Sequence, residues 1–221
     1  MIAKRVTAIT AQKRNPERVN VYLDGEFSFS LSRIVAAWLE PGVMLDQKKI
    51  DELLEKDTDE KAFQAALRFL DYRPRTEKEI RAKLQQKGFE PQKTEPVIAR
   101  LKSSGMVRDE RFALAWVESR NEFHPRSQRL MRYEMRNKGI EDGLIEKALQ
   151  GSASDLELAA RAAQKLKRRY AALEWKEFQA KMSAFLARRG FSYDVVAPTV
   201  KTAWNELQSE HTNDENEEPG E

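Results

Sequence analysis

One short segment carries arginines at spacings that would align them on one face of a helix. Between Ser127 and Lys138 the only acidic residue is Glu134, so pairing within one helix would not neutralise the segment. At about 100° per residue the arginines span an arc of about 120°, opposite the apolar side chains. Guanidinium groups bind phosphates and carboxylates, and a tyrosine among them can stack on a base. The candidates for binding an anionic partner are Arg126, Arg129, Arg132, Tyr133, Arg136 and Lys138.

A second basic cluster lies between positions 161 and 169, where no acid interrupts it. Arg161, Lys165 and Arg168 follow the i, i+4, i+7 spacing and share one helix face. Lys167 and Arg169 point elsewhere. For both clusters an ordinary solvated helix surface remains the alternative to a binding face.

Residues suited to catalysis or metal binding are scarce. The chain has no cysteine and two histidines, of which His124 precedes a proline at a helix junction. Phosphate-binding loops and dinucleotide fingerprints do not occur, and no His, Asp or Glu cluster has metal-ligand spacing. We therefore expect no catalytic residues, no metal and no cofactor, which excludes an enzyme.

The charge is distributed unevenly. The whole chain has a formal net charge of +3, but residues 208–221 contain acids and no lysine or arginine. A basic body with an acidic end points to an anionic partner. We expect this tail to be disordered and dispensable for folding, either competing for the basic surface or keeping the protein soluble. No apolar run approaches the ~18 residues of a membrane span.

The N-terminal region alternates in the manner of strands. Apolar residues at every second position flank Asp24-Gly25, which predicts a β-hairpin with one apolar face that includes Phe27. Short helices are expected at 33–39 and from Asp46 to about Lys56. From Thr58 onward nothing reads as strand.

The remainder repeats with a period of 51 residues. The segments LQQKGF, MRNKGI and LARRGF place Gly88, Gly139 and Gly190 at this offset, and Pro74-Arg75-Thr76 corresponds to Pro125-Arg126-Ser127. A fixed period of this size indicates stacked supersecondary units. Each glycine supplies the left-handed conformation that ends a helix. Thr76 followed by Glu79 is a capping box.

These patterns predict a mainly α fold of tandem three-helix repeats in an elongated, curved array, preceded by a small β-hairpin and helix module. The expected divisions are residues 1–57 for this module, 58–107, 108–151 and 152–207 for repeats 1 to 3, and 208–221 for the acidic tail.

The repeated pattern resembles the RecX family, which regulates the RecA recombinase. The resemblance covers roughly residues 58–207 and, more loosely, the N-terminal module. Repeat 1 departs from it by four extra residues after Phe89, and repeat 3 has Trp175-Lys176 in place of the Pro-Arg-Ser/Thr triplet. The residues that carry it are Pro74-Arg75-Thr76, Lys87-Gly88-Phe89, the segment 108–113, Trp116, Arg120, Lys138-Gly139-Ile140 and the segment 189–194.

The resemblance implies a non-enzymatic cytoplasmic protein of DNA repair and the SOS response. Its partner would be the RecA filament, which it would bind along the helical groove to limit filament growth, strand exchange and co-protease activity. Some members also bind DNA, so single- or double-stranded DNA is a second candidate partner. We expect a monomer without a membrane partner. The alternative is a nucleic-acid-binding helical protein with no recombinase partner.

Overall fold

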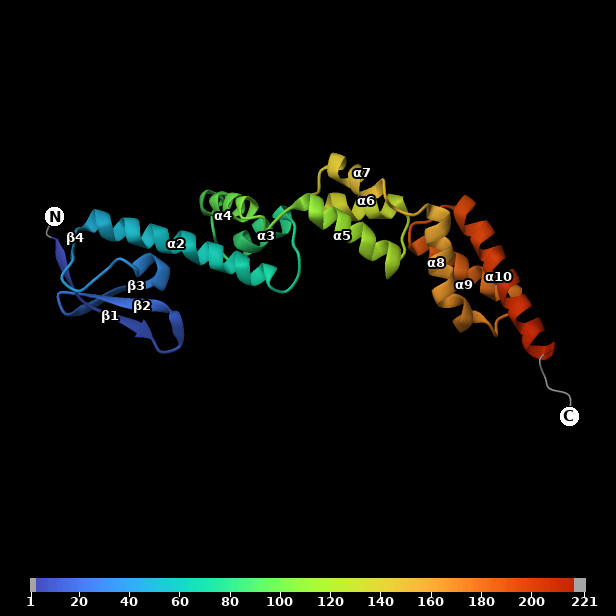
Figure 1. The fold of residues 1–221 in the computed structure, drawn as a ribbon, viewed down its shortest axis with the longest axis horizontal. Helices are drawn as coiled ribbons and strands as arrows, with labels where there is room; N and C mark the ends of the chain where they lie inside the picture. The colour runs from blue at the N-terminus through green and yellow to red at the C-terminus, as the bar shows by residue number, and fades with distance from the viewer. Residues whose placement is uncertain (1–2, 217–221) are drawn as a thin grey trace. The chain divides into compact units, whose positions relative to one another are not determined.

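The computed structural model describes residues 3–216, and the side chains of residues 3–210. The described chain is mainly helical with a small N-terminal sheet, as the sequence indicated (Figure 1). It divides into two compact units, Met1–Val107 and Arg108–Glu221. Among the described residues, the first unit contains two apolar clusters, one at the sheet and one in repeat 1, and the second contains one.

The N-terminal unit begins with an antiparallel sheet of order β3-β2-β1-β4. Its strands are β1 (Lys4–Gln12), β2 (Asn15–Leu23), β3 (Glu26–Ser32) and β4 (Met44–Leu45). The predicted hairpin is confirmed, because β2 pairs with β3 across Asp24 and Gly25, both of which have positive φ. A tight turn of this kind needs such dihedral angles.

The prediction that Phe27 lies on the apolar face of the hairpin is wrong. The register shifts between Val21 and Tyr22, so that Phe27 pairs with Tyr22. Phe27 is 59% exposed and its ring meets that of Tyr22 edge to face at 6.0 Å. A β-bulge moves side chains to the other face of a sheet in this way. Val21 and Leu31 remain fully buried.

The predicted break near Lys56 is also wrong. After the short α1 (Arg33–Ala36), one helix, α2 (Gln47–Leu70), runs through the expected boundary at residues 57 and 58. Asp46 caps its start by accepting from the Lys49 N–H at 2.8 Å. The end of α2 packs with α3 (Glu77–Gln86) and α4 (Pro91–Ser103) to form repeat 1.

Asp57, at the expected boundary, joins α2 to the sheet. Its buried carboxylate accepts hydrogen bonds from both the N–H and the hydroxyl of Ser32, each at 2.6 Å. The guanidinium of Arg18 and the ammonium of Lys61 also donate to it. Burial raises the pKa of Asp57, but these donors outweigh burial and hold the pKa below its ordinary value. This group fastens the sheet to α2.

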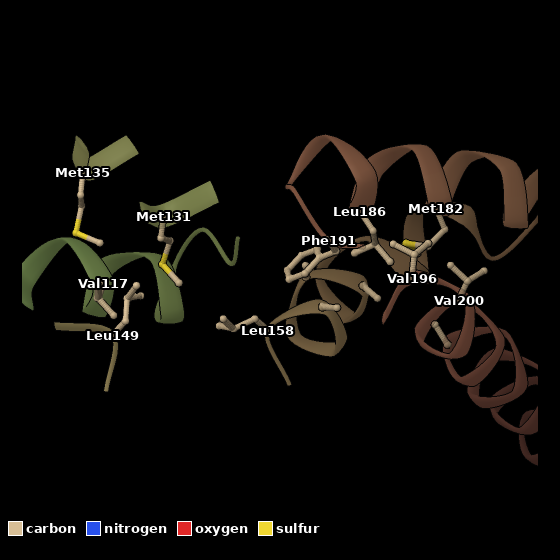
Figure 2. Close-up of a cluster of buried hydrophobic side chains, with 14 of the residues drawn as sticks. Val117, Met131, Met135, Leu149, Leu158, Met182, Leu186, Phe191, Val196 and Val200 are labelled. Atoms are coloured by element: carbon tan, nitrogen blue, oxygen red, sulfur yellow. The ribbon is translucent and has the colours of Figure 1, made fainter. Parts of the chain in front are cut away.

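The C-terminal unit contains repeats 2 and 3. Repeat 2 comprises α5 (Asp109–Glu122), α6 (Gln128–Asn137) and α7 (Asp142–Leu149). Repeat 3 comprises α8 (Asp155–Lys167), the 3₁₀ turn η1 (Arg168–Tyr170), α9 (Trp175–Arg188) and α10 (Tyr193–Asn216). The two repeats share one continuous core. Figure 2 shows Met131 and Met135 at one end of this core, and Met182, Leu186 and Phe191 at the other.

The repeat glycines share one helix-ending geometry. Gly88, Gly139 and Gly190 all have φ between 83° and 87°. In every case the glycine N–H donates to the carbonyl three residues back, at 2.9 Å, and the next residue donates five residues back. This is the Schellman arrangement, which satisfies the last carbonyls of a helix. The periodic glycines therefore mark three equivalent caps.

The acidic tail differs from expectation. Residues 208–216 belong to α10, and residues 217–221 lie outside the described residues. Lys167 of α8 is almost fully buried and pairs with Glu206 at 2.9 Å and with Glu210 at 2.8 Å. The hydrogen bond that Lys167 donates to Glu210, opposed by burial, raises the pKa of Lys167. Removing residues from 209 onward would leave Lys167 with one acid instead of two, so Glu210 contributes an ion pair between α10 and α8.

Candidate functional site

The local sequence fixes which face of α6 points outward. The Ser127 hydroxyl accepts from the Leu130 N–H at 3.1 Å and starts the helix. Met131 and Met135, one turn apart, are fully buried against the core. On the opposite side Tyr133 is 62% exposed. The face predicted from the arginine spacing is therefore the outer face of α6.

Most arginines of this face are paired, which corrects the expectation of an unneutralised stripe. Arg132 donates two hydrogen bonds to Glu146 of α7, at 2.7 and 3.0 Å. Arg136 pairs with Asp142 at 2.6 Å. The guanidinium of Arg132 holds the pKa of Glu146 below its ordinary value. The prediction considered acids within the segment only, whereas the acids that pair with Arg132 and Arg136 come from the next helix.

Arg126 is paired as well. It forms an ion pair with Glu134, whose carboxylate also accepts from Arg120 and from the Trp116 indole N–H, each at 3.1 Å. Burial, and then the positive charges of Arg120 and Arg189, lower the pKa of Arg126. This partly buried network ties the start of α6 to α5.

A matching ion pair occurs one repeat earlier. Arg81 donates two hydrogen bonds to Glu95, at 2.8 and 3.1 Å. Both residues lie 51 positions before Arg132 and Glu146. In repeats 1 and 2 the bridge joins the second helix to the third. Arg132 therefore has a structural role that recurs with the repeat.

Arg129 and Tyr133 differ from the other candidates on α6 in their partners. Among the residues that the structure describes, no carboxylate pairs with Arg129, whose guanidinium donates to the Gly190 carbonyl at 3.4 Å. Tyr133 follows one turn later, in the i+4 position that shares a face. Lys138 lies over aromatic rings, with its Nζ 4.8 Å from the Trp116 ring centre and 5.6 Å from that of Phe112. The remaining outward pair is Arg129 with Tyr133.

The basic residues of the second predicted cluster also fall into two groups, one with backbone partners and one exposed to solvent. Lys165 donates to the carbonyls of Glu122 and Phe123, each at 3.0 Å, at the C-terminal end of α5. A lysine at this end of a helix satisfies free carbonyls and complements the helix dipole. Arg161 and Arg168 are exposed on α8 and η1. They remain candidates for an anionic partner.

Sequence reasoning missed the residues that join repeats 2 and 3. Arg189 donates to the Pro125 carbonyl at 2.9 Å, and its own carbonyl accepts from the Ser127 N–H at 3.0 Å. Gly190 lies against Ser127 and Leu130. The Lys/Arg-Gly pattern showed that Arg189 precedes a cap, but it could not show that the cap packs against the preceding repeat.

Neither a metal site nor a membrane-spanning helix occurs in the described part of the chain. Within residues 3–210, no group of three or more His, Cys, Asp or Glu side chains could hold a metal ion. Among the described helices, none is long and apolar enough to cross a bilayer.

Comparison with known proteins matches four family models in order along the chain. They are the regulatory protein RecX N-terminal domain at residues 4–46 and the first, second and third RecX three-helix domains at 62–101, 109–149 and 153–198. The regulatory protein RecX of Bacillus pumilus is 34% identical over 93% of this chain and 80% of its own length. That of Bacillus subtilis is 33% identical over 96% and 80%.

Solved structures show the same relationship. A crystal structure of regulatory protein RecX aligns with a TM-score of 0.67 at 30% identity, covering 87% of this chain and 96% of the other. The crystal structure of RecX from Lactobacillus salivarius aligns with a TM-score of 0.55 at 26% identity, covering 67% and 97%.

Proposed function

The chain belongs to the RecX family of regulatory proteins, and from this we propose that it regulates the RecA recombinase. It binds the RecA–DNA filament along its groove and limits filament growth, strand exchange and co-protease activity. The observation that carries the proposal is the ordered match to all four RecX domains over residues 4–198. The N-terminal module and all three repeats are thus those of the family.

The paired and unpaired arginines take different parts in this proposal. Arg126, Arg132 and Arg136 are engaged by acids of the same unit and hold its helices together. Arg129 keeps most of its guanidinium donors for a ligand, and Tyr133 stands beside it. Contact with the anionic filament is therefore made by Arg129, Tyr133, Arg161 and Arg168.

Arg129→Ala and Arg132→Ala provide a matched test, because the two residues lie three positions apart on one helix. Arg129→Ala should reduce inhibition of the DNA-dependent ATPase of RecA about 10- to 100-fold, as expected for a lost charge-assisted hydrogen bond of ~1.5–3 kcal/mol. Arg132→Ala breaks a surface ion pair, so it should cost about 0–1 kcal/mol of stability and leave inhibition near that of the wild type. The assay is ATPase rate against inhibitor concentration.

Two results would count against this account. Wild-type protein without effect on the RecA ATPase would remove the proposed function. Equal losses from both variants would show that the paired guanidinium of Arg132 matters for binding as much as the open guanidinium of Arg129.

A further inference from the structure

Two exposed aromatic side chains occupy the same position in successive repeats. Tyr72, just after α2, is 85% exposed, and Phe123, just after α5, is 58% exposed. Their positions differ by 51 residues, the period that also relates the glycine caps. Each stands at the corner between the first and second helices of its repeat, two residues before a Pro-Arg pair. We call Tyr72 and Phe123 the corner aromatics.

Recurrence separates these two residues from other exposed apolar side chains. Single exposed apolar residues are common on protein surfaces. Within the described residues, the other large exposed apolar side chains have no large, exposed apolar counterpart 51 positions away. Exposing a ring at an equivalent place in both repeats indicates a shared role for the two corners.

The corner of repeat 2 is held rigidly. The Phe123 N–H donates to the Ser119 carbonyl at 3.0 Å, and its carbonyl accepts from the Lys165 ammonium at 3.0 Å. Two residues later the Pro125 carbonyl accepts from Arg189 at 2.9 Å. The backbone is therefore fixed on both sides of the ring, while the ring is exposed.

The corner of repeat 1 is fixed by different contacts. The guanidinium of Arg75 stacks on the Phe69 ring, 4.0 Å from its centre. Arg73 pairs with Glu79 at 3.1 Å and donates to the Pro74 carbonyl at 3.2 Å. Tyr72 therefore also projects from an ordered loop. Rigid presentation lowers the entropy that a side chain loses on binding.

Repeat 3 shows that the three-helix unit folds without an aromatic residue at the equivalent position. The residue equivalent to Phe123 is Glu174. The next residue, Trp175, packs on Trp204 with ring centres 5.5 Å apart, and Trp204 packs on Phe178 at 5.2 Å. Trp175 is 38% exposed, less than either corner aromatic, and one side of its ring packs on a residue that borders the core. The exposed rings of repeats 1 and 2 are not required for folding.

We propose that the corner aromatics insert into equivalent apolar pockets on two successive, identical subunits of the polymer partner. The inference rests on the proposed function, in which that polymer is the RecA filament. Aromatic residues such as tyrosine are over-represented among residues that dominate binding energy. Two equivalent sites on one chain match a ligand that repeats one site, because the second contact then forms intramolecularly.

Charge favours a protein pocket over stacked nucleic-acid bases. A single-strand site combines rings with cations that are available to phosphates. At the corners, Arg73 is paired with Glu79 and Arg126 with Glu134, and Arg75 covers Phe69. Lys165 is occupied by backbone carbonyls. The cations beside the two rings therefore already have partners within the chain. Rings without free cations beside them are suited to an apolar pocket on a protein.

The test compares Tyr72→Ala, Phe123→Ala and the double variant with Tyr193→Ala. Tyr193 is 84% exposed at the start of α10 and stands at no such corner. Each corner variant should raise the dissociation constant for RecA filaments on single-stranded DNA on the order of tenfold or more. The double variant should raise it further than either, while Tyr193→Ala should change it less than about twofold. Melting temperatures should stay at the wild-type value, since the rings are exposed.

The same variants are measured on the single-stranded DNA without RecA. Unchanged DNA binding alongside weakened filament binding supports pockets on the subunits. An equal loss on bare DNA would show that the rings stack on bases and would overturn the proposal. Wild-type filament binding by the double variant would overturn it too, while leaving the proposed function intact. Wild-type protein that does not bind filaments at all would remove both.

Discussion

Asp57→Ala is expected to destabilise the N-terminal unit by about 3–5 kcal/mol, the cost of breaking a buried charge pair by removing one partner. The buried carboxylate receives four kinds of donor, from the Ser32 backbone and hydroxyl, Arg18 and Lys61. Without it the Ser32 N–H and part of the Arg18 charge lose their partner. Hydrogen exchange on peptides of residues 1–107 measures the loss.

Asp59→Ala is the control for this prediction. Asp59 lies on the same helix, is half-exposed and pairs with Lys93 at 2.9 Å. Surface ion pairs contribute about 0–1 kcal/mol, so this variant should stay close to the wild type. Equal effects from the two aspartates would show that Asp57 does not fasten the sheet to α2.

Asp57 also predicts how stability depends on pH. The pKa of Asp57 is held below its ordinary value in the folded protein. A lowered folded pKa stabilises the protein above the unfolded pKa of about 3.9, and this stabilisation is lost as the pH falls through the folded pKa. The free energy of unfolding of the N-terminal unit should therefore fall more steeply with decreasing pH below about pH 4. Asp57→Asn should weaken this pH dependence.

Gly190→Ala is expected to destabilise the C-terminal unit by about 2–5 kcal/mol, from two sources. A left-handed conformation costs an alanine ~1–2 kcal/mol, and overpacking adds ~1–3 kcal/mol. A Cβ at Gly190 would lie 2.6 Å from the Ser127 Oγ and 2.7 Å from the Leu130 Cβ. Urea unfolding of each variant gives the free energies.

Gly88→Ala separates the conformational cost from the overpacking cost. Gly88 has the same positive φ, but a Cβ there would meet nothing within 4 Å. Only the conformational cost of ~1–2 kcal/mol should remain. A Gly190 variant no less stable than the Gly88 variant would mean that repeat 3 does not pack closely against α6 at this cap.

Local features of this fold were predictable from the sequence. The glycine caps and the capping box of Thr76 depend on residues within about five positions of each other, so their patterns are visible in the chain. The 51-residue period then followed from aligning the caps. Strand alternation around Asp24 predicted the hairpin for the same reason.

Features set by distant residues were not predictable in this way. Asp57 stood at the expected boundary between the N-terminal module and repeat 1, but its partners Ser32 and Arg18 lie 25 and 39 positions earlier. The acids that pair with Arg132 and Lys167 lie 14 and 39 or more positions away. Counting only the acids within one helix therefore overestimated the number of unpaired arginines on α6. Equally, only the structure shows that Tyr72 and Phe123 are more than half exposed, whereas Trp175 is 38% exposed and packs on Trp204.

The affinity of the protein for single-stranded DNA with and without bound RecA, at one salt concentration, tests the central claim most directly. Regulation through the filament predicts clearly tighter binding to the RecA–DNA complex, because several repeats engage one polymer and avidity can add on the order of 100-fold. It also predicts that binding coincides with inhibition of the RecA ATPase. Equal affinity for bare and RecA-coated DNA would contradict the account and would identify a nucleic-acid-binding protein without a recombinase partner.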